Sequence, residues 1–219
     1  YVINTAAETH VGNSIVDSKD FLDSNINGVY NLLELIKNYR LESNKKPILL
    51  HFSTDEVYGS LKPSDPPCIE TTSLDPNSPY AASKAAADLL ALASARTYKQ
   101  PVLITRCTNN YGPYQFPEKL IPLCIFNALT NKSIPIYGDG KQIRDWLYVK
   151  DHCKAIQSVL LRGKIGETYN VGGLNEKTNL EVAHAICHIL DELRPKADNE
   201  SYTKQIQFIQ DRPGHDRRY

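Results

Sequence analysis

Short apolar runs alternate with helical patterns along this chain, and no other feature of the sequence restricts the fold as strongly. Runs with the length and composition of β-strands occupy residues 1–5, 47–52, 102–107 and 168–171. Apolar residues recur at helical spacing in residues 18–40, 79–98, 149–161 and 179–193. This alternation predicts an α/β fold, in which an open and mostly parallel sheet carries helices on both faces. Ligands of such sheets bind at the carboxyl ends of the strands, so we expect reactive residues directly after each strand.

The regular alternation of strands and helices ends after Gly112, where a predicted helix near residues 117–131 is followed by turns. We therefore assign residues 1–112 to the main domain. Residues 113–219 are expected to form mainly a smaller substrate-binding lobe, with about 150–175 returning to the main sheet. With 219 residues, 41% of them hydrophobic, the chain is long enough for one core and a smaller lobe packed against it.

The charges exclude several classes of partner. Lysine plus arginine and aspartate plus glutamate both total 25, so the net charge is zero and we expect neither nucleic acid nor membrane as a partner. No apolar run approaches the roughly 20 residues that span a bilayer. The five cysteines form no CxxC pair, which favours a reducing cytoplasm and argues against a zinc site. Cys107 and Cys153 are expected to be small buried hydrophobic residues.

Tyr80 and Lys84 are separated by one helical turn and therefore lie on one face of the predicted helix at 79–98. An ammonium group there can lower the pKa of a tyrosine and can hold a ribose. The spacing is common on ordinary helices, so the pair alone favours a solvated contact.

A second candidate motif follows the strand that ends near Phe52, in the run Ser-Thr-Asp-Glu-Val-Tyr-Gly at 53–59. Asp55 and Glu56 could act there as a separate acid and base. Because each carboxylate raises the pKa of the other, we expect Asp55 and Glu56 to titrate as a coupled pair with raised pKa values. An isolated pair of this kind would more simply be a solvated turn.

Several motifs in fixed order carry a resemblance over essentially the whole chain. They are Ala-Ala-Glu-Thr-His-Val at 6–11, Thr-Asp-Glu at 54–56, Ser-Pro-Tyr-Ala-Ala-Ser-Lys at 78–84, Asn-Asn-Tyr-Gly-Pro at 109–113, Phe-Pro-Glu-Lys-Leu-Ile-Pro at 116–122, Gln-Ile-Arg-Asp-Trp-Leu-Tyr-Val at 142–149 and Asp-Arg-Pro-Gly-His-Asp at 211–216. In these motifs the chain resembles the extended short-chain dehydrogenase/reductase family and, within it, the dTDP-glucose 4,6-dehydratases. The resemblance implies a doubly wound, Rossmann-like parallel sheet with NAD as cofactor, and makes residues 1–112 the later part of the NAD-binding domain.

The resemblance also implies a reaction on a nucleotide sugar, with dTDP-glucose as the expected substrate. Tyr80, assisted by Lys84, would take the proton of the sugar 4-hydroxyl while C4 gives a hydride to NAD, and Thr54 would hydrogen-bond the reacting hydroxyl. Glu56 would remove the C5 proton and Asp55 would protonate the departing 6-hydroxyl, after which the hydride returns to C6. The product would be dTDP-4-keto-6-deoxyglucose, an intermediate of deoxysugar biosynthesis such as rhamnose supply.

The remaining site residues are carried over from the family pattern. The catalytic set is Thr54, Asp55, Glu56, Tyr80 and Lys84. The cofactor-binding set is Thr5, Ala6, Ala7, Glu8, Thr9, Ser24, Tyr80, Lys84 and Asn110. The substrate-binding set is Thr9, Thr54, Asn109, Lys119, Leu120, Pro135, Ile136, Tyr137, Arg144, Asn179, Arg212 and His215. Arg144 and Arg212 are the expected diphosphate ligands because guanidinium groups suit phosphate oxygens.

One family feature lies outside this sequence. The glycine-rich loop after the first strand, which would hold the NAD pyrophosphate, is absent, and Gly138-Asp139-Gly140 lies in a turn without the required strand and helix. We expect that upstream residues of a longer protein, including the first strands, precede Tyr1. His184, Cys187 and His188 share one predicted helix but lack a second ligand cluster, so no metal site is predicted.

Two alternatives to this function remain open. A nucleotide-sugar epimerase or decarboxylase of the same family would share Tyr80 and Lys84 but would have no evident need for Asp55 and Glu56. A catalytically silent scaffold relative is the second alternative, and the intact catalytic set argues against it. The family pattern also implies a homodimer formed by the helix at 18–40 and the Tyr80 helix, which periodicity cannot establish.

Overall fold

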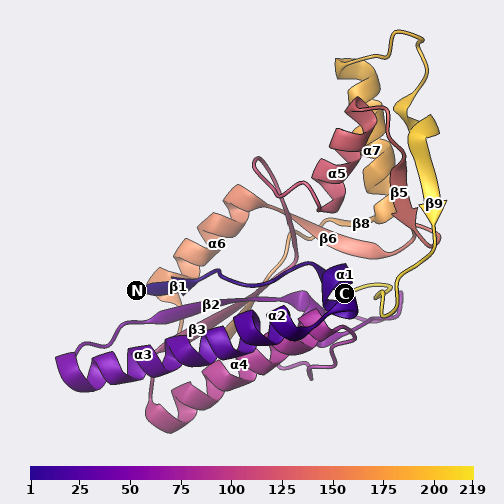
Figure 1. Ribbon diagram of the computed structural model, residues 1–219. Helices are drawn as coiled ribbons and strands as arrows, with labels where there is room; N and C mark the ends of the chain where they lie inside the picture. The colour runs from indigo at the N-terminus through magenta and orange to yellow at the C-terminus, as the bar shows by residue number, and fades with distance from the viewer.

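The computed structural model describes residues 1–219, and its central layer is a four-stranded parallel sheet (Figure 1). Its strands lie in the order β1 (Val2–Asn4), β2 (Leu49–Thr54), β3 (Val102–Cys107) and β7 (Thr168–Val171). The pairing is parallel throughout, with Leu50 opposite Leu103 and Ile104 opposite Thr168. All four carboxyl ends therefore meet at one edge of the sheet.

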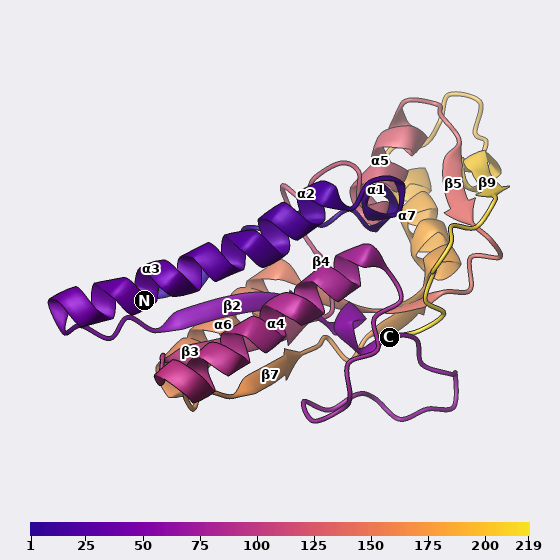
Figure 2. The same cartoon turned by 60° about the horizontal axis from the view of Figure 1, so that its bottom comes forward.

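Helices cover both faces of this sheet, as the alternating sequence pattern predicts. These helices are α3 (Gly28–Ser43), α4 (Pro79–Tyr98) and α6 (Val149–Arg162). Successive strand residues point to opposite faces. Leu49 and Val102 accordingly pack against α3 and α4, which lie side by side, whereas Leu50 and Leu103 pack against α6 on the other face (Figures 1 and 2). The doubly wound α/β fold is confirmed.

The helix that carries Tyr80 begins where the sequence predicts. Ser78 is its N-cap, and the Ser78 hydroxyl accepts a hydrogen bond of 3.1 Å from the Ala81 amide. Pro79 occupies the first helical position, where its missing amide hydrogen costs nothing. The predicted bounds of this helix, 79–98, are confirmed at both ends.

The predicted helix at 18–40 is divided in the structure. It consists of α2 (Lys19–Phe21), a π-helical turn η1 (Leu22–Asn27) and α3. The wide turn carries Asn25, whose side chain is almost completely buried. A π-turn inserts an extra residue into the helical register, and helical periodicity of the sequence does not reveal it.

The rest of the chain forms a smaller lobe beside the carboxyl edge of the sheet (Figure 1). Its elements are β4 (Asn109–Tyr111), α5 (Leu120–Leu129), β5 (Ile134–Tyr137), β6 (Ile143–Tyr148), β8 (Glu176–Thr178), α7 (Asn179–Leu193), η3 (Tyr202–Gln205) and β9 (Ile206–Ile209). Strands β4, β6 and β8 form one small sheet, and β5 pairs with β9. A separate core holds the lobe together, built around Ile134, Trp146, Ala183 and Tyr202.

Cys153 is exposed rather than buried, because α6 turns the neighbouring residues His152 and Ile156 toward the sheet. The strand β7 pairs with β3 in the main sheet, while the division of the chain at residue 112 stays a prediction. None of the helices combines the length and apolar character that crossing a membrane requires.

Candidate active site

A cleft of about 290 Å³ lies between the carboxyl edge of the sheet and the lobe. Its lining includes every predicted substrate residue except Thr54, together with Glu56: Thr9, Asn109, Lys119, Leu120, Pro135, Ile136, Tyr137, Arg144, Asn179, Arg212 and His215. These residues come from the loop after β1 and from β4, α5, β5, β6, α7 and the C-terminal segment. Residues more than 200 positions apart in the sequence therefore share one cleft.

The cleft combines the carboxylates of Glu56 and Glu118 with the cations Lys119, Arg144 and Arg212. Burial raises the pKa of Glu56 above its ordinary value, although Arg144, Arg212 and Lys119 act in the opposite direction. The Lys119 ammonium donates to the carbonyl oxygen of Thr9 at 3.0 Å, which ties the lobe to the loop after β1. A cleft with this charge pattern can accept an anionic ligand beside a buried base.

Arg144 is fixed in the cleft wall. Its guanidinium donates to the carbonyl oxygens of Ile143 at 2.7 Å and Asp216 at 2.9 Å, and it lies 4.0 Å from the centre of the Tyr219 ring. The side chain is buried and preorganised, so ordering it for a ligand costs little conformational entropy.

His215 contributes a neutral ring to the same cleft. Its Nδ1 lies 2.6 Å from Asp211 Oδ1, yet burial lowers the pKa of His215 to about 4. The contact is therefore a hydrogen bond rather than an ion pair at neutral pH. The Tyr137 ring meets the imidazole edge-on at 6.2 Å.

Thr54, Asp55 and Glu56 lie where β2 ends in the short 3-10 turn η2 (Asp55–Tyr58). The Thr54 hydroxyl accepts from the Glu56 amide at 3.3 Å and donates to Asp55 Oδ1 at 3.2 Å. Gly59 ends the turn with a φ of +78°, where a Cβ would lie 2.1 Å from the carbonyl oxygen of Asp75. This position requires glycine.

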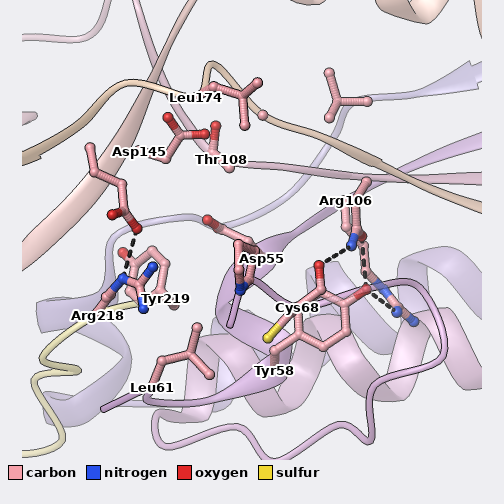
Figure 3. A pocket seen from close by; sticks show the side chains of 15 residues that line it. Asp55, Tyr58, Leu61, Cys68, Arg106, Thr108, Asp145, Leu174, Arg218 and Tyr219 are labelled. Atoms are coloured by element: carbon pink, nitrogen blue, oxygen red, sulfur yellow. Dashed lines mark hydrogen bonds and ion pairs between the residues drawn. The ribbon is translucent and has the colours of Figure 1, made fainter. Parts of the chain in front are cut away.

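The pKa of Asp55 is raised, as the adjacent carboxylates in the sequence predict. Burial raises the pKa of Asp55 well above its ordinary value, and the charge of Glu56 raises it further. This shift favours the protonated form of the Asp55 carboxyl. The side chains differ in position, however, because Asp55 lines a second cavity on the far side of the turn (Figure 3).

Tyr80 and Lys84 are both buried on α4, but the expected effect of the lysine on the tyrosine is not found. The Lys84 ammonium donates to the carbonyl oxygen of Phe52 at 2.6 Å. Burial raises the pKa of Tyr80 well above its ordinary value, and Glu56 raises it further. The expectation that Lys84 lowers the pKa of Tyr80 is therefore wrong for this state of the site, since the phenol faces a carboxylate.

A buried polar network below the site was not predicted. Asp88, one helical turn beyond Lys84, accepts from Arg106 Nε at 2.8 Å, and Arg106 Nη1 donates to the Tyr58 hydroxyl at 2.8 Å. The Tyr58 hydroxyl donates to Asn170 Oδ1 at 2.7 Å. Burial lowers the pKa of Lys84, and Asp88 is the strongest opposing charge. The i,i+4 spacing of Lys84 and Asp88 was the available sequence signal.

The predicted cofactor residues gather at the same edge of the sheet. Thr5, Ala6, Ala7, Glu8 and Thr9 form the loop after β1, Ser24 lies in η1, and Asn110 lies in β4. Asn25, which the sequence analysis missed, accepts from the Glu8 amide at 2.9 Å and donates to the Glu8 carbonyl at 3.0 Å and to the Ser83 hydroxyl at 2.9 Å. It therefore joins this loop to α4.

No cluster of three or more metal-ligating side chains is present. His184 and His188 stack on one face of α7 with ring centroids 6.3 Å apart, while Cys187 is buried in the core of the lobe. These three residues do not converge on one point.

The chain is 54% identical to a dTDP-glucose 4,6-dehydratase of Escherichia coli over its full length, which spans 63% of that relative. A Bacillus anthracis dTDP-glucose 4,6-dehydratase crystallised with NAD is 49% identical, with a TM-score of 0.83 over 99% of this chain and 61% of that one. A UDP-glucuronic acid 4-epimerase of Bacillus cereus, crystallised with UDP-glucuronic acid and NAD, is 28% identical with a TM-score of 0.83, over 98% of this chain and 63% of that one.

The fold is thus shared by dehydratases and epimerases, and the chain spans just under two thirds of the relatives that it matches. The family model described as GDP-mannose 4,6 dehydratase matches residues 1–219. The chain belongs to this GDP-mannose 4,6 dehydratase family, and within it is similar to the dTDP-glucose 4,6-dehydratases.

Proposed function

We propose that the protein of which this chain is a part catalyses the NAD-dependent dehydration of dTDP-glucose to dTDP-4-keto-6-deoxyglucose. The observation that carries the proposal is the adjacent pair Asp55 and Glu56, in which burial and Glu56 raise the pKa of Asp55 and Glu56 shares a cleft with Arg144 and Arg212. Elimination of water needs an acid and a base on different atoms of one substrate. Epimerisation has no such need, so this pair favours a dehydratase over the epimerase or decarboxylase alternative.

The oxidation step belongs to Tyr80, Thr54 and Lys84. Tyr80 takes the proton of the sugar 4-hydroxyl, and Thr54 orients that hydroxyl. Lys84 holds the nicotinamide ribose and adds a positive charge nearby. Burial and Glu56 raise the pKa of Tyr80, so positive charge supplied by bound NAD would be needed to favour the base form.

Glu56 then removes the C5 proton, which the new 4-keto group has made acidic, and Asp55 protonates the departing 6-hydroxyl. Tyr219 lines both cavities beside the pair. Glu56 finally returns its proton to C5. One carboxylate could not serve C5 and the leaving group at the same time.

The cleft residues hold the nucleotide. Arg144 and Arg212 bind the diphosphate, since they are the two arginines that line the cleft and guanidinium groups suit phosphate oxygens. The remaining residues contact the sugar and the base: Thr9, Asn109, Lys119, Leu120, Pro135, Ile136, Tyr137, Asn179 and His215.

Bound NAD would supply a hydride acceptor for C4 and a hydride donor for C6. The residues of this chain that would hold it are Thr5, Ala6, Ala7, Glu8, Thr9, Ser24, Tyr80, Lys84 and Asn110. The fit is supported by the Asn110 side-chain oxygen, which is buried without a hydrogen-bond partner, and by the rigid loop held through Asn25. Such a buried acceptor suits an amide donor like that of nicotinamide.

The protein is further proposed to act as a cytoplasmic homodimer. Exposed apolar side chains on α3 and α4, namely Tyr30, Leu35, Tyr39, Leu89 and Tyr98, support an interface at these helices. Sedimentation of the full-length protein tests this, and a monomer at micromolar concentration would contradict it.

The deciding experiment incubates the full-length protein with NAD and dTDP-glucose. Formation of the alkali-sensitive absorbance of a 4-keto sugar and loss of one water by mass are expected, and Glu56→Gln and Tyr80→Phe should abolish both. Parallel reactions with UDP- and GDP-glucose test the choice of base. A folded protein that binds NAD but makes no keto sugar from any nucleotide glucose would refute the proposal and favour an epimerase or a silent scaffold.

A further inference from the structure

The short helix α1 (Val11–Val16) buries a polar residue and exposes an apolar one. Ser14 is its one buried residue and is 1% exposed, whereas Val16 on the same helix is 89% exposed. Helices normally turn their apolar residues inward, and a polar side chain that is buried instead needs hydrogen-bond partners. The contacts of Ser14 therefore indicate what this helix does.

The Ser14 hydroxyl has two partners, and one of them is the backbone of the proposed base. It donates to the carbonyl oxygen of Val11 at 2.7 Å and accepts from the amide of Tyr80 at 3.2 Å. Because its one hydrogen is directed at Val11, a lone pair is left to face Tyr80. Tyr80 is the second residue of α4, where an amide has no acceptor within its own helix. Ser14 therefore supplies, from another segment, the acceptor that α4 lacks.

The carbonyl group of Tyr80 is held in a similar way. The Ser83 hydroxyl donates to the Tyr80 carbonyl oxygen at 2.7 Å and accepts from the Asn25 side chain at 2.9 Å. Asn25 in turn bonds both backbone groups of Glu8. The Phe21 ring meets the Tyr80 ring edge-on at 6.4 Å. The segment that follows β1 thus contacts the backbone amide, the carbonyl group and the ring of Tyr80.

We infer that Ser14 is a positioning residue, which couples the loop at 5–9 to the phenol that accepts the 4-hydroxyl proton. The inference rests on the proposed function, which makes Tyr80 the base and gives residues 5–9 a share of the cofactor. Helix α1 follows this loop directly, with His10 as its N-cap. Oxidation at C4 needs the phenol beside the hydroxyl and the hydride acceptor beside the carbon at the same time. A displacement of about 1 Å between them can lower the rate about a hundredfold.

Ser14→Ala removes this acceptor without adding an atom. In the full-length, NAD-loaded protein, kcat for dTDP-glucose should fall about tenfold to a hundredfold, with KM changed less than about twofold. The deuterium isotope effect of dTDP-glucose labelled at C4 should also rise, because hydride transfer from C4 then limits the rate. A loss of folded protein alone would lower kcat without changing that isotope effect.

Ser94→Ala is the matched control. Ser94 is also a buried serine, and its hydroxyl donates to the Gln100 side chain near the other end of α4. This variant should be destabilised to a similar extent as Ser14→Ala, but with wild-type kcat and a wild-type isotope effect at C4. A Ser14→Ala protein whose kcat and isotope effect match those of Ser94→Ala would overturn the inference.

Two further outcomes are distinguishable. A wild-type protein that makes no keto sugar refutes the proposed function before any variant is compared. If Ser14→Ala fails to fold, amide hydrogen exchange of the full-length wild-type protein replaces it. The Tyr80 amide should exchange more slowly with NAD bound than without it, because the loop at 5–9 is continuous with α1. Exchange of the Tyr80 amide that NAD does not slow would overturn the inference.

Discussion

Asp88 Oδ2 lies 2.8 Å from Arg106 Nε, and both side chains are buried between α4 and β3. Asp88 also opposes the burial that lowers the pKa of Lys84 one turn earlier in the helix. Through Arg106 and Tyr58 the same carboxylate supports the turn that carries Asp55 and Glu56. The buried Asp88 carboxylate thus acts on Lys84 in α4 and, through Arg106 and Tyr58, on the turn that carries Asp55 and Glu56.

Asp88→Asn is therefore expected to affect both stability and pH dependence. Loss of one partner of a buried ion pair should lower the free energy of unfolding by about 3–5 kcal/mol. Without Asp88 the pKa of Lys84 falls further, so Lys84 loses its charge at lower pH and the alkaline limb of kcat/KM moves to lower pH. Urea unfolding and pH-rate profiles of the full-length protein measure the two effects.

Asp151→Asn is the control for this variant. Its partner Lys154 lies 2.8 Å away, but both side chains are well exposed. An exposed pair contributes at most about 1 kcal/mol, and Asp151 is remote from Lys84 in the sequence and lies on another helix. Equal losses of stability in the two variants would contradict the importance of burial at Asp88.

Asp55→Asn should increase stability while abolishing turnover. The pKa of Asp55 is raised in the folded state, so the folded protein holds a proton that the unfolded chain releases as pH rises above its ordinary value of 3.8. The stabilisation contributed by the protonated Asp55 carboxyl is complete below pH 3.8. It is lost as the pH rises through the folded-state pKa of Asp55. Asp55→Asn has no carboxyl to ionise. Its free energy of unfolding relative to wild type should therefore increase by about 1.4 kcal/mol for each pH unit between 3.8 and the folded-state pKa of Asp55.

Thermal unfolding of wild type and Asp55→Asn at a series of pH values measures the gain. The two proteins should be similar near pH 3, and the variant should be more stable at pH 7. A variant that is less stable at pH 7 than wild type would show that Asp55 is ionised and paired in the folded protein.

Asn25→Ala should weaken NAD binding, because Asn25 alone joins both backbone groups of Glu8 to the Ser83 hydroxyl. Loss of the Asn25 hydrogen bonds to Glu8 and Ser83 should cost about 1–3 kcal/mol. The loop at 5–9 would then be held less firmly in its position. Titration of the full-length protein with NAD should show weaker affinity. Asn27→Ala, on the same helical turn but exposed, should bind NAD as wild type does, and equal effects in both variants would contradict the role of Asn25.

Local sequence signals predicted the elements that carry the site. The helix at 79–98 follows from the Ser78-Pro79 cap and a long apolar face, and the position of Asp55 and Glu56 follows from the end of a strand. Their burial and coupled pKa values could also be expected, because the carboxyl edge of a doubly wound sheet is partly enclosed.

Tertiary packing decided the features that the sequence did not reveal. Lys84 donates to Phe52 rather than acting on Tyr80, since the Phe52 carbonyl at the end of β2 happens to lie under α4. Asp55 and Glu56 face different cavities because the loop at 60–77 and β7 build a wall on one side of η2 only. Asp88 meets Arg106 only after β3 has joined the sheet.

Gly59→Ala should displace the turn that carries both carboxylates. Gly59 has a φ of +78°, and a Cβ there would lie 2.1 Å from the Asp75 carbonyl oxygen, so the variant combines backbone strain with a collision. Gly166→Ala is the matched control, because Gly166 has a φ of +88° with nothing within 4 Å of its Cβ position. Strain alone should cost about 1–3 kcal/mol in the control, without loss of kcat. Gly59→Ala should lose more stability and most of its kcat, since relief of the collision must move either Asp75 or η2. Equal stabilities together with full activity in Gly59→Ala would show that the turn tolerates displacement, and that the positions of Asp55 and Glu56 are set by other contacts.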